Sequence, residues 1–574
     1  MRQERTNAAH DDVFDVIVVG AGWSGLIAAK TFLQVRPSAN LLIIDSDSTI
    51  GGTWSKSRLY PNLRCEAGWG LFHFSDLNMD HEGIGRDDTI PGSAVYRYLD
   101  AYAAKFDLHR RTLLDTKAER IERVDQPIPW RLRILTSQTP RTLHCHKLIV
   151  ATGLTSRPFI PDVPRDDFRG QIYHSKELGI LATQEALTDD AVQDVTVYGG
   201  SKSAFEAVYY LVQLGKRVQW IIRPDGGGPS MMTPVKMLGF LPSFNLNNTR
   251  FFGVLSPNVF DRSSWWYRCF HGPHRLAIAD WVVMTYWRVT TWMMCLSANY
   301  GRSCNGEKLK PHLGLESSFW SPATLGVMTC PNLWDYIHDA KLITVHRQSV
   351  QKLSSGHVEL DNGVCLASDA FIFATGWQAN HSIFDDVECE DLGLPRPPDT
   401  VSGKSSAFIQ LRRSAEEKVV RDLPLLSHSP PGYEVQPGDD YQLYRFLVPT
   451  SEKYGDGSIA YIGFLRNTGL PIVLEAQALW ATAYLLGLME LPGHDQRQWE
   501  AVQTSAWIRR RYLCGRKVPF ALFDWFSYVD QLYADLGVVS RRKGNWFSET
   551  FAVYRPEEFR GVVQEWLAGH QPVM

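Results

Sequence analysis

Short runs of aliphatic and β-branched residues alternate along this chain with longer segments that mix polar and apolar positions. Continuous apolar runs bounded by turn-forming residues predict buried strands, and the longer mixed segments predict helices. The runs expected as strands are 16–19, 41–44, 148–150, 195–198, 218–223, 370–373 and 459–464. This order of strands and helices predicts an α/β protein.

The first strand leads into a glycine pattern with a defined chemistry. Gly20, Gly22 and Gly25 form G-x-G-x-x-G between strand 16–19 and a helix rich in small residues. A pyrophosphate can reach the free N–H groups and the positive end of a helix only where no side chain covers the backbone. We expect Gly20 to make the turn, Gly22 to admit the phosphates and Gly25 to let helix and strand pack closely.

The next strand ends in Asp45, about twenty residues after the last glycine, where a Rossmann-like unit carries its ribose-binding acid. The string that follows contains Gly52, Thr53 and Trp54. The glycine lets a flat ligand approach the backbone, the threonine offers a hydroxyl, and the tryptophan offers a stacking face. These residues are therefore predicted to bind a dinucleotide cofactor.

Residues 195–223 repeat the order of strand, tight turn, helix and strand. The glycine pattern is degraded, because Ser201 replaces the second glycine and Ala204 the third. Small side chains still permit close packing, so a second Rossmann-like dinucleotide-binding domain is expected. The candidate cofactor contacts in its turn are Gly199, Ser201, Lys202 and Ser203.

The last strand of the second unit ends in Arg223, and Lys216 and Arg217 precede it. The corresponding strand of the first unit ends in an acid, Asp45. A carboxylate repels a 2′-phosphate, whereas arginine attracts it, so NADPH is favoured over NADH. Lys202 is a second candidate for a phosphate contact. For Lys202 and Arg223, the alternative is that they are ordinary solvated cations.

GAGWSG, the acid closing the second strand, and GGTW followed by YP together resemble the class B flavin monooxygenases. This superfamily contains the flavin-containing and the Baeyer–Villiger monooxygenases. The resemblance implies FAD in the first unit, NADPH in the second and a flavin hydroperoxide as the oxidant. It also implies that two Ala-Thr-Gly turns, containing Thr152 and Thr375, are crossings between the domains and cofactor contacts. The likeness covers nearly the whole chain, and the C-terminal part resembles fungal members of this group.

Phe168, Gly170 and His174 match the family fingerprint F-x-G-x-x-x-H. Leu178 stands where Baeyer–Villiger enzymes carry tryptophan, a departure that favours the flavin-containing monooxygenases. For His174, a hydrogen-bonded place in the linker is favoured over a chemical role. The segment after residue 468 is expected to be an amphipathic helix. The resemblance places its start, at 468–471, over the flavin, where its dipole would stabilise negative charge.

Glu66 is the one candidate catalytic residue. It stands where flavin-containing monooxygenases have asparagine and Baeyer–Villiger enzymes have aspartate. A carboxylate could hold a basic partner or act as a base toward substrate, which a neutral amide could not. The alternative is a surface glutamate.

Residues 224–331 are read as a mainly helical, tryptophan-rich insertion in the second domain. The stretch 276–298 is long and apolar, but Asp280 and Arg288 interrupt it, which argues against a transmembrane helix. Three interpretations of this helix remain open: it lines an apolar substrate cavity, it lies on a membrane surface, or it is ordinary core. Peripheral membrane contact through the insertion is therefore an expectation to test.

Composition narrows the class further. With 574 residues the chain is too long for one core, and 12% aromatic content indicates apolar pockets or interfaces. The net charge of −3 argues against nucleic acid. Nine scattered cysteines without a CxxC pair predict neither disulfides nor a metal site, and buried reduced thiols in a cytoplasmic protein are expected. The polar N-terminal stretch 1–12 does not resemble a secretory signal.

The predicted organisation is an FAD domain in two parts, 10–160 and 376–490, around an NADPH domain at 161–375, with a C-terminal helical region at 491–574. The expected activity is insertion of one oxygen atom from O2 into a bulky apolar molecule, a fungal polyketide or terpenoid. Baeyer–Villiger insertion, oxidation or cyclisation without oxygen transfer, and a flavoprotein with a dead site are the alternatives.

Overall fold

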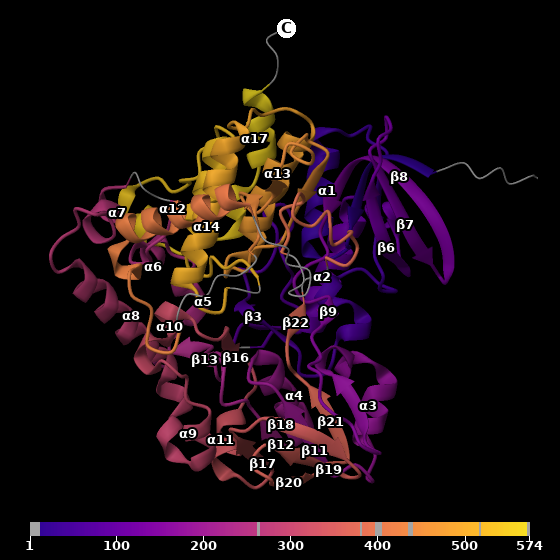
Figure 1. Ribbon diagram of the computed structural model, residues 1–574, viewed down its shortest axis with the longest axis vertical. Coiled ribbons are helices and arrows are strands. Elements are labelled where there is room, and N and C mark those ends of the chain that lie inside the picture. Colours follow the sequence, from indigo (N-terminus) through magenta and orange to yellow (C-terminus); the bar gives the residue numbers. More distant parts are fainter. Residues whose placement is uncertain are drawn as a thin grey trace, which may run out of the picture.

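The computed structural model describes residues 12–85, 87–260, 264–378, 381–395, 405–433, 440–515 and 518–570. Most of the N-terminal stretch considered for a signal lies outside these residues. Two large sheets, one mixed and one parallel, organise the chain, and in Figure 1 the first lies at the upper right and the second at the bottom. The C-terminal helices lie at the top and the insertion at the left.

The first sheet has seven strands in the order β5-β2-β1-β8-β7-β6, and β25 also pairs with β8. β1, β2, β5, β8 and β25 form its parallel part, and β6 and β7 complete it as an antiparallel meander. β25 comes from far along the chain, so a distant segment completes the first nucleotide unit. The strands are β1 (Asp12–Val19), β2 (Leu41–Ile44), β5 (Thr112–Leu113), β6 (Thr116–Arg123), β7 (Trp130–Thr136), β8 (Thr139–Val150) and β25 (Ile459–Tyr461).

The second sheet has the order β10-β21-β11-β12-β17, and all its neighbours are parallel. Strands buried on both faces read as continuous apolar runs, which is why the sequence pattern located β11, β12 and β21, while β10 and β17 were not predicted. β12 ends at residue 221, two residues before the predicted end. The elements are β10 (Gln171–His174), β11 (Asp194–Tyr198), α4 (Lys202–Gln213), β12 (Arg217–Ile221), β17 (Ile343–His346) and β21 (Ala370–Phe373).

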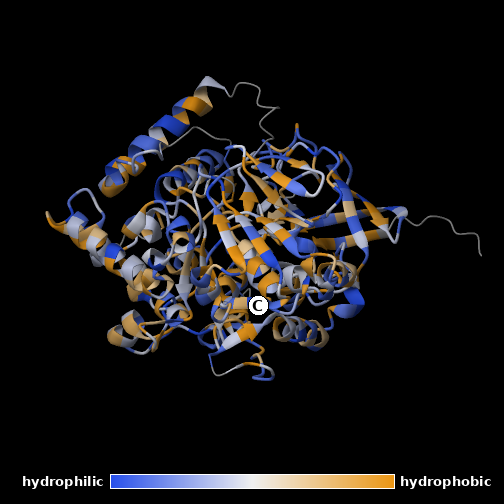
Figure 2. Cartoon of the chain, turned by 90° about the horizontal axis from the view of Figure 1, so that it is seen from below, coloured by the Kyte–Doolittle hydropathy of each residue, from blue (hydrophilic) through white to orange (hydrophobic). Residues whose placement is uncertain are grey.

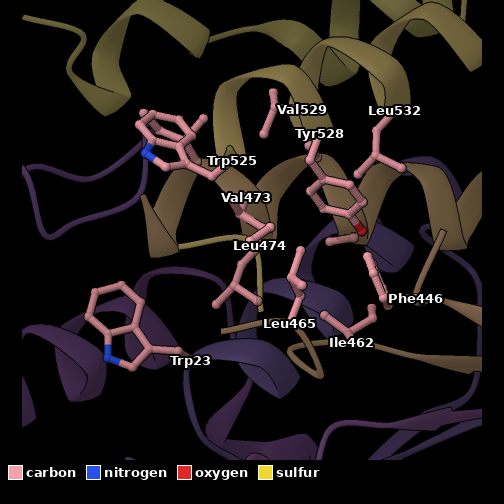
Figure 3. Close-up of a cluster of buried hydrophobic side chains, with 14 of the residues drawn as sticks. Trp23, Phe446, Ile462, Leu465, Val473, Leu474, Trp525, Tyr528, Val529 and Leu532 are labelled. Atoms are coloured by element: carbon pink, nitrogen blue, oxygen red, sulfur yellow. The ribbon is translucent and has the colours of Figure 1, made fainter. Parts of the chain in front are cut away.

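α13 (Leu470–Leu485) packs beside α1 (Trp23–Val35) in the middle of the largest core cluster. Figure 3 shows Val473 and Leu474 of α13 between Trp23 of α1 and Trp525 of α15 (Trp525–Asp535). From the sequence α13 was expected to be amphipathic, and that expectation is wrong. Nearly all of its residues are buried, because helices cover it all round.

The insertion is framed by β13 (Met231–Pro234) and β16 (Leu325–Met328), which pair in parallel. Its helices pack against the C-terminal helices: the buried Arg511 donates to the carbonyl oxygen of Phe319 and to Ser256 Oγ. Mainly helical character is confirmed. The other elements are β14 (Lys236–Met237), β15 (Leu241–Pro242), α5 (Ser243–Asn247), α6 (Arg250–Val254), α7 (Trp265–Phe270), α8 (Ala279–Cys295), α9 (Cys304–Lys308) and α10 (Ser317–Trp320).

The remaining elements connect and cover these units. Figure 2 shows apolar residues on the strands in the middle and mixed character on outer helices. Within the described residues, no helix is long and apolar enough to cross a bilayer. The elements are β3 (Arg64–Gly68), β4 (Thr89–Pro91), α2 (Gly92–Lys105), β9 (Arg157–Pro158), α3 (Leu181–Thr188), α11 (Leu333–Asp339), β18 (Val350–Ser354), β19 (His357–Leu360), β20 (Cys365–Ala367), β22 (Trp377–Gln378), α12 (Ser406–Asp422), β23 (Leu443–Tyr444), β24 (Val448–Pro449), α14 (His494–Arg511), α16 (Trp546–Phe551) and α17 (Val562–Gly569).

The nine cysteines are all free, as expected. The expectation that they are buried holds for only some of them. Cys304 and Cys365 are exposed, whereas burial raises the pKa of the Cys65 thiol to about 12.

Candidate functional site

The three glycines of the first turn meet different neighbours. Gly20 has φ +116°, and a Cβ there would lie 2.4 Å from the carbonyl oxygen of Ala151. A Cβ on Gly25 would lie 1.7 Å from the carbonyl oxygen of Gly20. Gly22 differs, because its Cβ would make only ordinary contacts, with Gly52 Cα at 3.4 Å, Gly52 N at 3.7 Å and the carbonyl oxygen of Gly51 at 3.8 Å. Gly22 also borders a cavity at this turn, so the missing side chain fits a phosphate cradle.

Asp45 lies beside this turn, at the end of β2. Its Oδ2 accepts a hydrogen bond from the backbone N–H of Ala21 at 2.6 Å, and its Oδ1 accepts one from Asp47 at 2.9 Å. Burial raises the pKa of Asp45, while the two backbone hydrogen bonds oppose that shift. The carboxylate is therefore oriented by the backbone, and Asp45 lies in the cavity wall; its contact with a ribose stays a prediction.

A cavity of about 1060 Å³ opens at the glycine turn and extends to the insertion. Its wall brings together many of the residues predicted from the sequence, from both nucleotide units. Predicted residues in the wall are Gly20, Gly22, Asp45, Gly52, Thr53, Trp54, Glu66, Thr152 and Lys202. Gly25, Gly199, Ser201, Ser203, Arg223 and Thr375 do not line it.

Several polar atoms of the wall are buried without a hydrogen-bond partner among the described residues. They are Thr152 Oγ1, Ser156 Oγ, Asn247 Oδ1 and Asn467 Oδ1. Buried polar groups are normally paired, so such a set fits a polar ligand such as the FAD that the family implies. Of these four, the sequence pointed only to Thr152.

Arg58 is the most prominent wall residue that sequence reasoning missed. It is buried, donates from Nη2 to the carbonyl oxygen of Thr155 at 2.6 Å, and lies 5.2 Å from the ring centroid of Trp377. Burial lowers the pKa of Arg58, and the negative charges of Asp47 and Asp45 oppose that shift. Its only sequence signal is its place in the string after GGTW.

Glu66 lies on β3 and is half-buried in the cavity wall. Its Oε1 accepts a hydrogen bond from the backbone N–H of Val327 at 3.2 Å. Gly326 allows this approach, because a Cβ there would lie 3.0 Å from the same oxygen. The reading of Glu66 as a plain surface glutamate is therefore wrong: it joins the first unit to the insertion strand β16.

Lys202 begins α4 but points into the interior. Its Nζ donates to Glu206 Oε1 at 2.7 Å and to the carbonyl oxygen of Arg64 at 3.2 Å, and Tyr60 donates to the other carboxylate oxygen at 2.7 Å. Burial lowers the pKa of Lys202, but Glu206 and Glu66 outweigh it and raise the pKa above its usual value. The alternative of a solvated lysine is wrong, and its contact with a phosphate stays a prediction.

The second nucleotide turn lies at the carboxyl end of β11. Gly199 has φ +146°, and a Cβ there would lie 2.1 Å from the carbonyl oxygen of Ala374. Ser201 is the N-cap of α4, and its side chain makes no capping bond. Thr375 Oγ1 donates to the carbonyl oxygen of Phe159. The turn thus has the expected backbone shape without lining the large cavity.

Arg223 is exposed and lies 3.5 Å from Asp225. The two cations that precede it in the sequence lie at the opposite end of β12. Arg217 pairs with Asp194, and Lys216 is buried and donates to the carbonyl oxygen of Asp189. Of the three basic residues, only Arg223 lies at the edge where nucleotides bind.

His174 is a structural, hydrogen-bonded residue, as expected. Its Nδ1 accepts from the backbone N–H of Lys176 at 3.1 Å, so its Nε2 donates to the carbonyl oxygen of Gly376 at 3.1 Å. Burial lowers its pKa to about 4, which keeps the ring neutral. The histidine therefore fixes the first linker to the second Ala-Thr-Gly turn.

The far wall of the cavity comes from the insertion and from the C-terminal region. α8 contributes Met294, while its Trp287 is buried against Phe252 and Phe523. The long aromatic helix thus buries one side, touches the cavity through Met294 and leaves Trp281 and Trp292 exposed. Leu522 and Phe523, which the sequence did not single out, complete the apolar side.

A family model described as pyridine nucleotide-disulphide oxidoreductase matches residues 14–234. The chain is 49% identical to FAD-dependent monooxygenase rstn6 of Aspergillus nomiae, over 97% of this chain and 98% of that protein. It is 48% identical to FAD-dependent monooxygenase resA of Aspergillus sclerotiorum, over 97% and 99%. The chain belongs to the family of these FAD-dependent monooxygenases. Membership confirms the resemblance seen in the sequence and makes this protein an FAD-dependent monooxygenase, an oxidoreductase that acts on a small molecule with O2.

Solved structures show the same fold. Cyclohexanone monooxygenase from Rhodococcus sp. Phi1 bound to NADP+ superposes with a TM-score of 0.58 at 16% identity, over 92% of this chain and 97% of that one. Cyclohexanone-bound cyclohexanone monooxygenase in the Rotated conformation gives 0.58 at 15% identity, over 92% and 98%. The α/β fold with two nucleotide-binding units is confirmed by this likeness.

Proposed function

We propose that this flavin monooxygenase uses NADPH and inserts one oxygen atom into a bulky apolar molecule, a fungal polyketide or terpenoid. The observation that carries the proposal is the continuous cavity that runs from the glycine turn to an apolar wall, with Glu66 in the wall between them. Bound FAD would supply the redox chemistry with O2. The chain supplies binding, orientation and exclusion of water.

The proposed FAD contacts are Gly20, Gly22, Asp45, Gly52, Thr53, Trp54 and Thr152. Their support is the place of Gly22 in the cavity wall, without a close backbone neighbour at its Cβ position, and the unpartnered hydroxyl of Thr152. The proposed NADPH contacts are Gly199, Ser201, Lys202, Ser203, Arg223 and Thr375, supported by the turn geometry at β11 and by Arg223 at the same edge. The two-part FAD domain at 10–160 and 376–490 is supported by β25, which pairs with β8.

Glu66 is proposed as the group that holds or moves a proton at its free Oε2. Its other oxygen is held by the N–H of Val327, so the carboxylate is fixed toward the cavity. Lys202 supplies a nearby positive charge. A fixed carboxylate in a partly apolar cavity is suited to general base catalysis or to binding a hydroxyl of the substrate.

Labelled oxygen tests the reaction type. The purified holoenzyme is given NADPH, ¹⁸O2 and a panel of polyketides and terpenoids, and products are analysed by mass spectrometry. One labelled oxygen atom in an alcohol or epoxide supports the proposal, and a labelled ring oxygen in an ester indicates Baeyer–Villiger insertion. Oxidised or cyclised product without label overturns oxygen transfer in favour of an oxidoreductase or cyclase.

We also propose that the protein works in the cytoplasm and touches a membrane surface through the insertion. The support for a reducing compartment is the set of nine free cysteines. Exposed apolar residues gather on α7, α8 and the adjoining turns, and we call this surface the tryptophan face. Its residues are Trp265, Trp266, Leu276, Ile278, Trp281, Val289, Trp292 and Leu296.

Tryptophan favours the boundary between lipid and water, and nearby cations favour anionic head groups. Arg268 and Arg288 are exposed on the same two helices. The inner side of α8 carries Met294 in the cavity wall, so one helix lies between the proposed membrane surface and the cavity. An apolar substrate dissolved in lipid would then have a short path to the site.

A further inference from the structure

The small sheet β18-β19-β20 carries three potential metal ligands, and none of them lines the cavity described above. They are His357 and Glu359 of β19 and Cys365 of β20. One atom of each lies within 4.8 Å of the other two: a ring nitrogen, a carboxylate oxygen and the thiol sulfur. Within the described ranges, no other three histidine, cysteine, aspartate or glutamate side chains come together in this way.

The antiparallel register explains why these side chains share a face. Glu359 lies directly opposite Cys365, and His357 precedes Glu359 by two residues on the same strand. Successive side chains of a strand point to opposite faces, so the three lie on the outer face, while Val358 and Leu366 are buried. The sequence predicted no metal site, because a hairpin register and not a short motif brings the ligands together.

A hydrogen bond at the other ring nitrogen orients His357. Its Nδ1 lies 2.9 Å from the carbonyl oxygen of Ser355, which can only accept, so Nδ1 carries a proton. In the neutral ring Nε2 is then an acceptor, and it lies 3.3 Å from Glu359 Oε1, which is an acceptor too. Two acceptors this close need a cation or a second ring proton between them. Histidines that bind metals usually donate their other N–H in this manner.

Glu359 is held at the same place and has one competing cation. Its Oε1 accepts a hydrogen bond from Ser354 Oγ at 2.9 Å, which orients the carboxylate. Lys352 lies opposite Glu359 on β18, with Nζ 3.5 Å from Oε1 and 3.6 Å from Asp166 Oδ2. Exposed ion pairs contribute little, so the ammonium group is a weak competitor that can stay with Asp166.

The chemistry of the three ligands selects the metal. Cys365 is free and exposed, so a metal ion can reach its sulfur from solvent. Imidazole, thiolate and carboxylate together suit zinc, whereas magnesium and calcium prefer oxygen ligands alone. A tetrahedral zinc ion with bonds of about 2.0–2.3 Å spaces its ligand atoms about 3.5 Å apart, so a small rotation of the exposed Cys365 side chain closes the site.

We propose that His357, Glu359 and Cys365 bind one Zn²⁺ ion, with water as the fourth ligand, on the outer face of the sheet β18-β19-β20. Cys365 gives its thiol proton to solvent on binding. The ion joins β20, an edge strand of three residues, to β19. The inner face of this sheet shares a hydrophobic cluster with Tyr198 and Phe373 of the second nucleotide unit. Zinc would thus stabilise that unit, and the inference does not depend on the proposed oxygen transfer.

Cobalt and zinc titrations of the FAD-loaded full chain, free of any histidine tag and treated first with a chelator, test the site. We expect one equivalent of Co²⁺ to give the strong red absorption of tetrahedral, thiolate-bound cobalt, where flavin does not absorb. Zn²⁺ should displace the cobalt and raise the thermal midpoint. His357→Gln, Glu359→Gln and Cys365→Ser should each weaken Zn²⁺ by about 10²-fold or more, because even the partners of metal ligands are worth about 10–100-fold.

Cys304→Ser is the matched control, because Cys304 is also exposed but lies on α9, outside the site. It should keep the cobalt absorption and the zinc affinity of the wild type. Lys352→Gln should tighten Zn²⁺, since it removes the competing positive charge. If the wild type binds Zn²⁺ no more tightly than Cys365→Ser, or if bound cobalt absorbs no more strongly than cobalt in water, the site is refuted. Flavin content and circular dichroism show that each variant is folded.

Discussion

At the scale of single residues, the nucleotide turn separates glycines required by packing from a glycine that leaves room for a ligand. Substituting Gly20 or Gly25 would drive a side chain into backbone atoms. Gly22 meets only ordinary contacts, so a side chain there would occupy ligand space instead. The same motif therefore contains residues for folding and a residue for binding.

Gly22→Leu should accordingly lose FAD while the chain still folds. The leucine side chain would fill the space between Gly22 and Gly52, where we expect the phosphates. The measurement is flavin absorbance per protein after purification, together with circular dichroism. Gly493→Leu is the control, because Gly493 is exposed with nothing near its Cβ position, and it should stay yellow.

Glu66→Gln should lower kcat by about 10²-fold or more, since the amide keeps the shape and loses the base. FAD content should not change, because the contact with Val327 N–H needs only an oxygen acceptor. Steady-state kinetics with a turned-over substrate measure the effect. Glu119→Gln is a matched control, because Glu119 also lines the cavity but is exposed. Equal loss in both variants would speak against a role of Glu66 in chemistry.

At the scale of elements, α13 combines a fully packed helix with one acidic side chain. Glu475 Oε1 accepts from the N–H and the hydroxyl of Ser75 at 3.1 and 2.6 Å, while Oε2 is buried without a partner among the described residues. Burial raises its pKa from 4.5 to about 8, with Ser75 opposing and Asp76 adding to the shift. The helix therefore carries a protonated carboxyl near neutral pH.

This raised pKa predicts a pH-dependent stability. Between pH 4.5 and about 8 the folded state binds this proton and the unfolded state does not, so the free energy of unfolding falls as pH rises. The loss is at most about 1.4 kcal/mol per pH unit. Glu475→Gln should remove this pH dependence, so that denaturant midpoints at about pH 6 and about pH 9 differ less than in the wild type. Glu490→Gln, at an exposed glutamate, should retain the wild-type difference.

At the scale of the whole molecule, the insertion and the C-terminal helices form one side of the protein, at the left and top in Figure 1. Arg250 of α6 pairs with Asp530 of α15, and Trp507 of α14 donates to the carbonyl oxygen of Pro257. These contacts join the insertion, which carries the tryptophan face, to the C-terminal helices. Membrane contact and substrate access would then be properties of the same side.

Trp281→Glu combined with Trp292→Glu should reduce sedimentation with anionic phospholipid vesicles by several-fold. Trp281 is 69% exposed and Trp292 is 50% exposed, so the fold should not depend on either side chain. Val387→Glu, at 79% exposure and outside the tryptophan face, is the control for added charge. If the wild-type protein remains in solution with such vesicles, membrane contact is contradicted. The flavin content of the double variant shows whether it is folded.

The strands of both units and the first glycine turn could be predicted because each is encoded locally. Buried parallel strands read as apolar runs, and a glycine with positive φ or a close backbone neighbour is visible in the motif itself. Burial of α13 on all sides was not predictable, since its pattern depends on helices from other parts of the chain. Arg58 and Asn467 were missed because single polar residues outside long helices and strands give no periodic signal.

The sequence by itself determined the family, the two nucleotide-binding units and the first cofactor turn, because these depend on contacts between residues close along the chain. Only the tertiary structure decided which distant residues share a site. It placed Glu66 against Val327, brought Lys202 to the carbonyl oxygen of Arg64, and paired β25 with β8. Such contacts arise from the order of the strands in the sheet and from the insertion folding back onto it. The spacing of residues along the sequence predicts neither the strand order nor the position of the insertion.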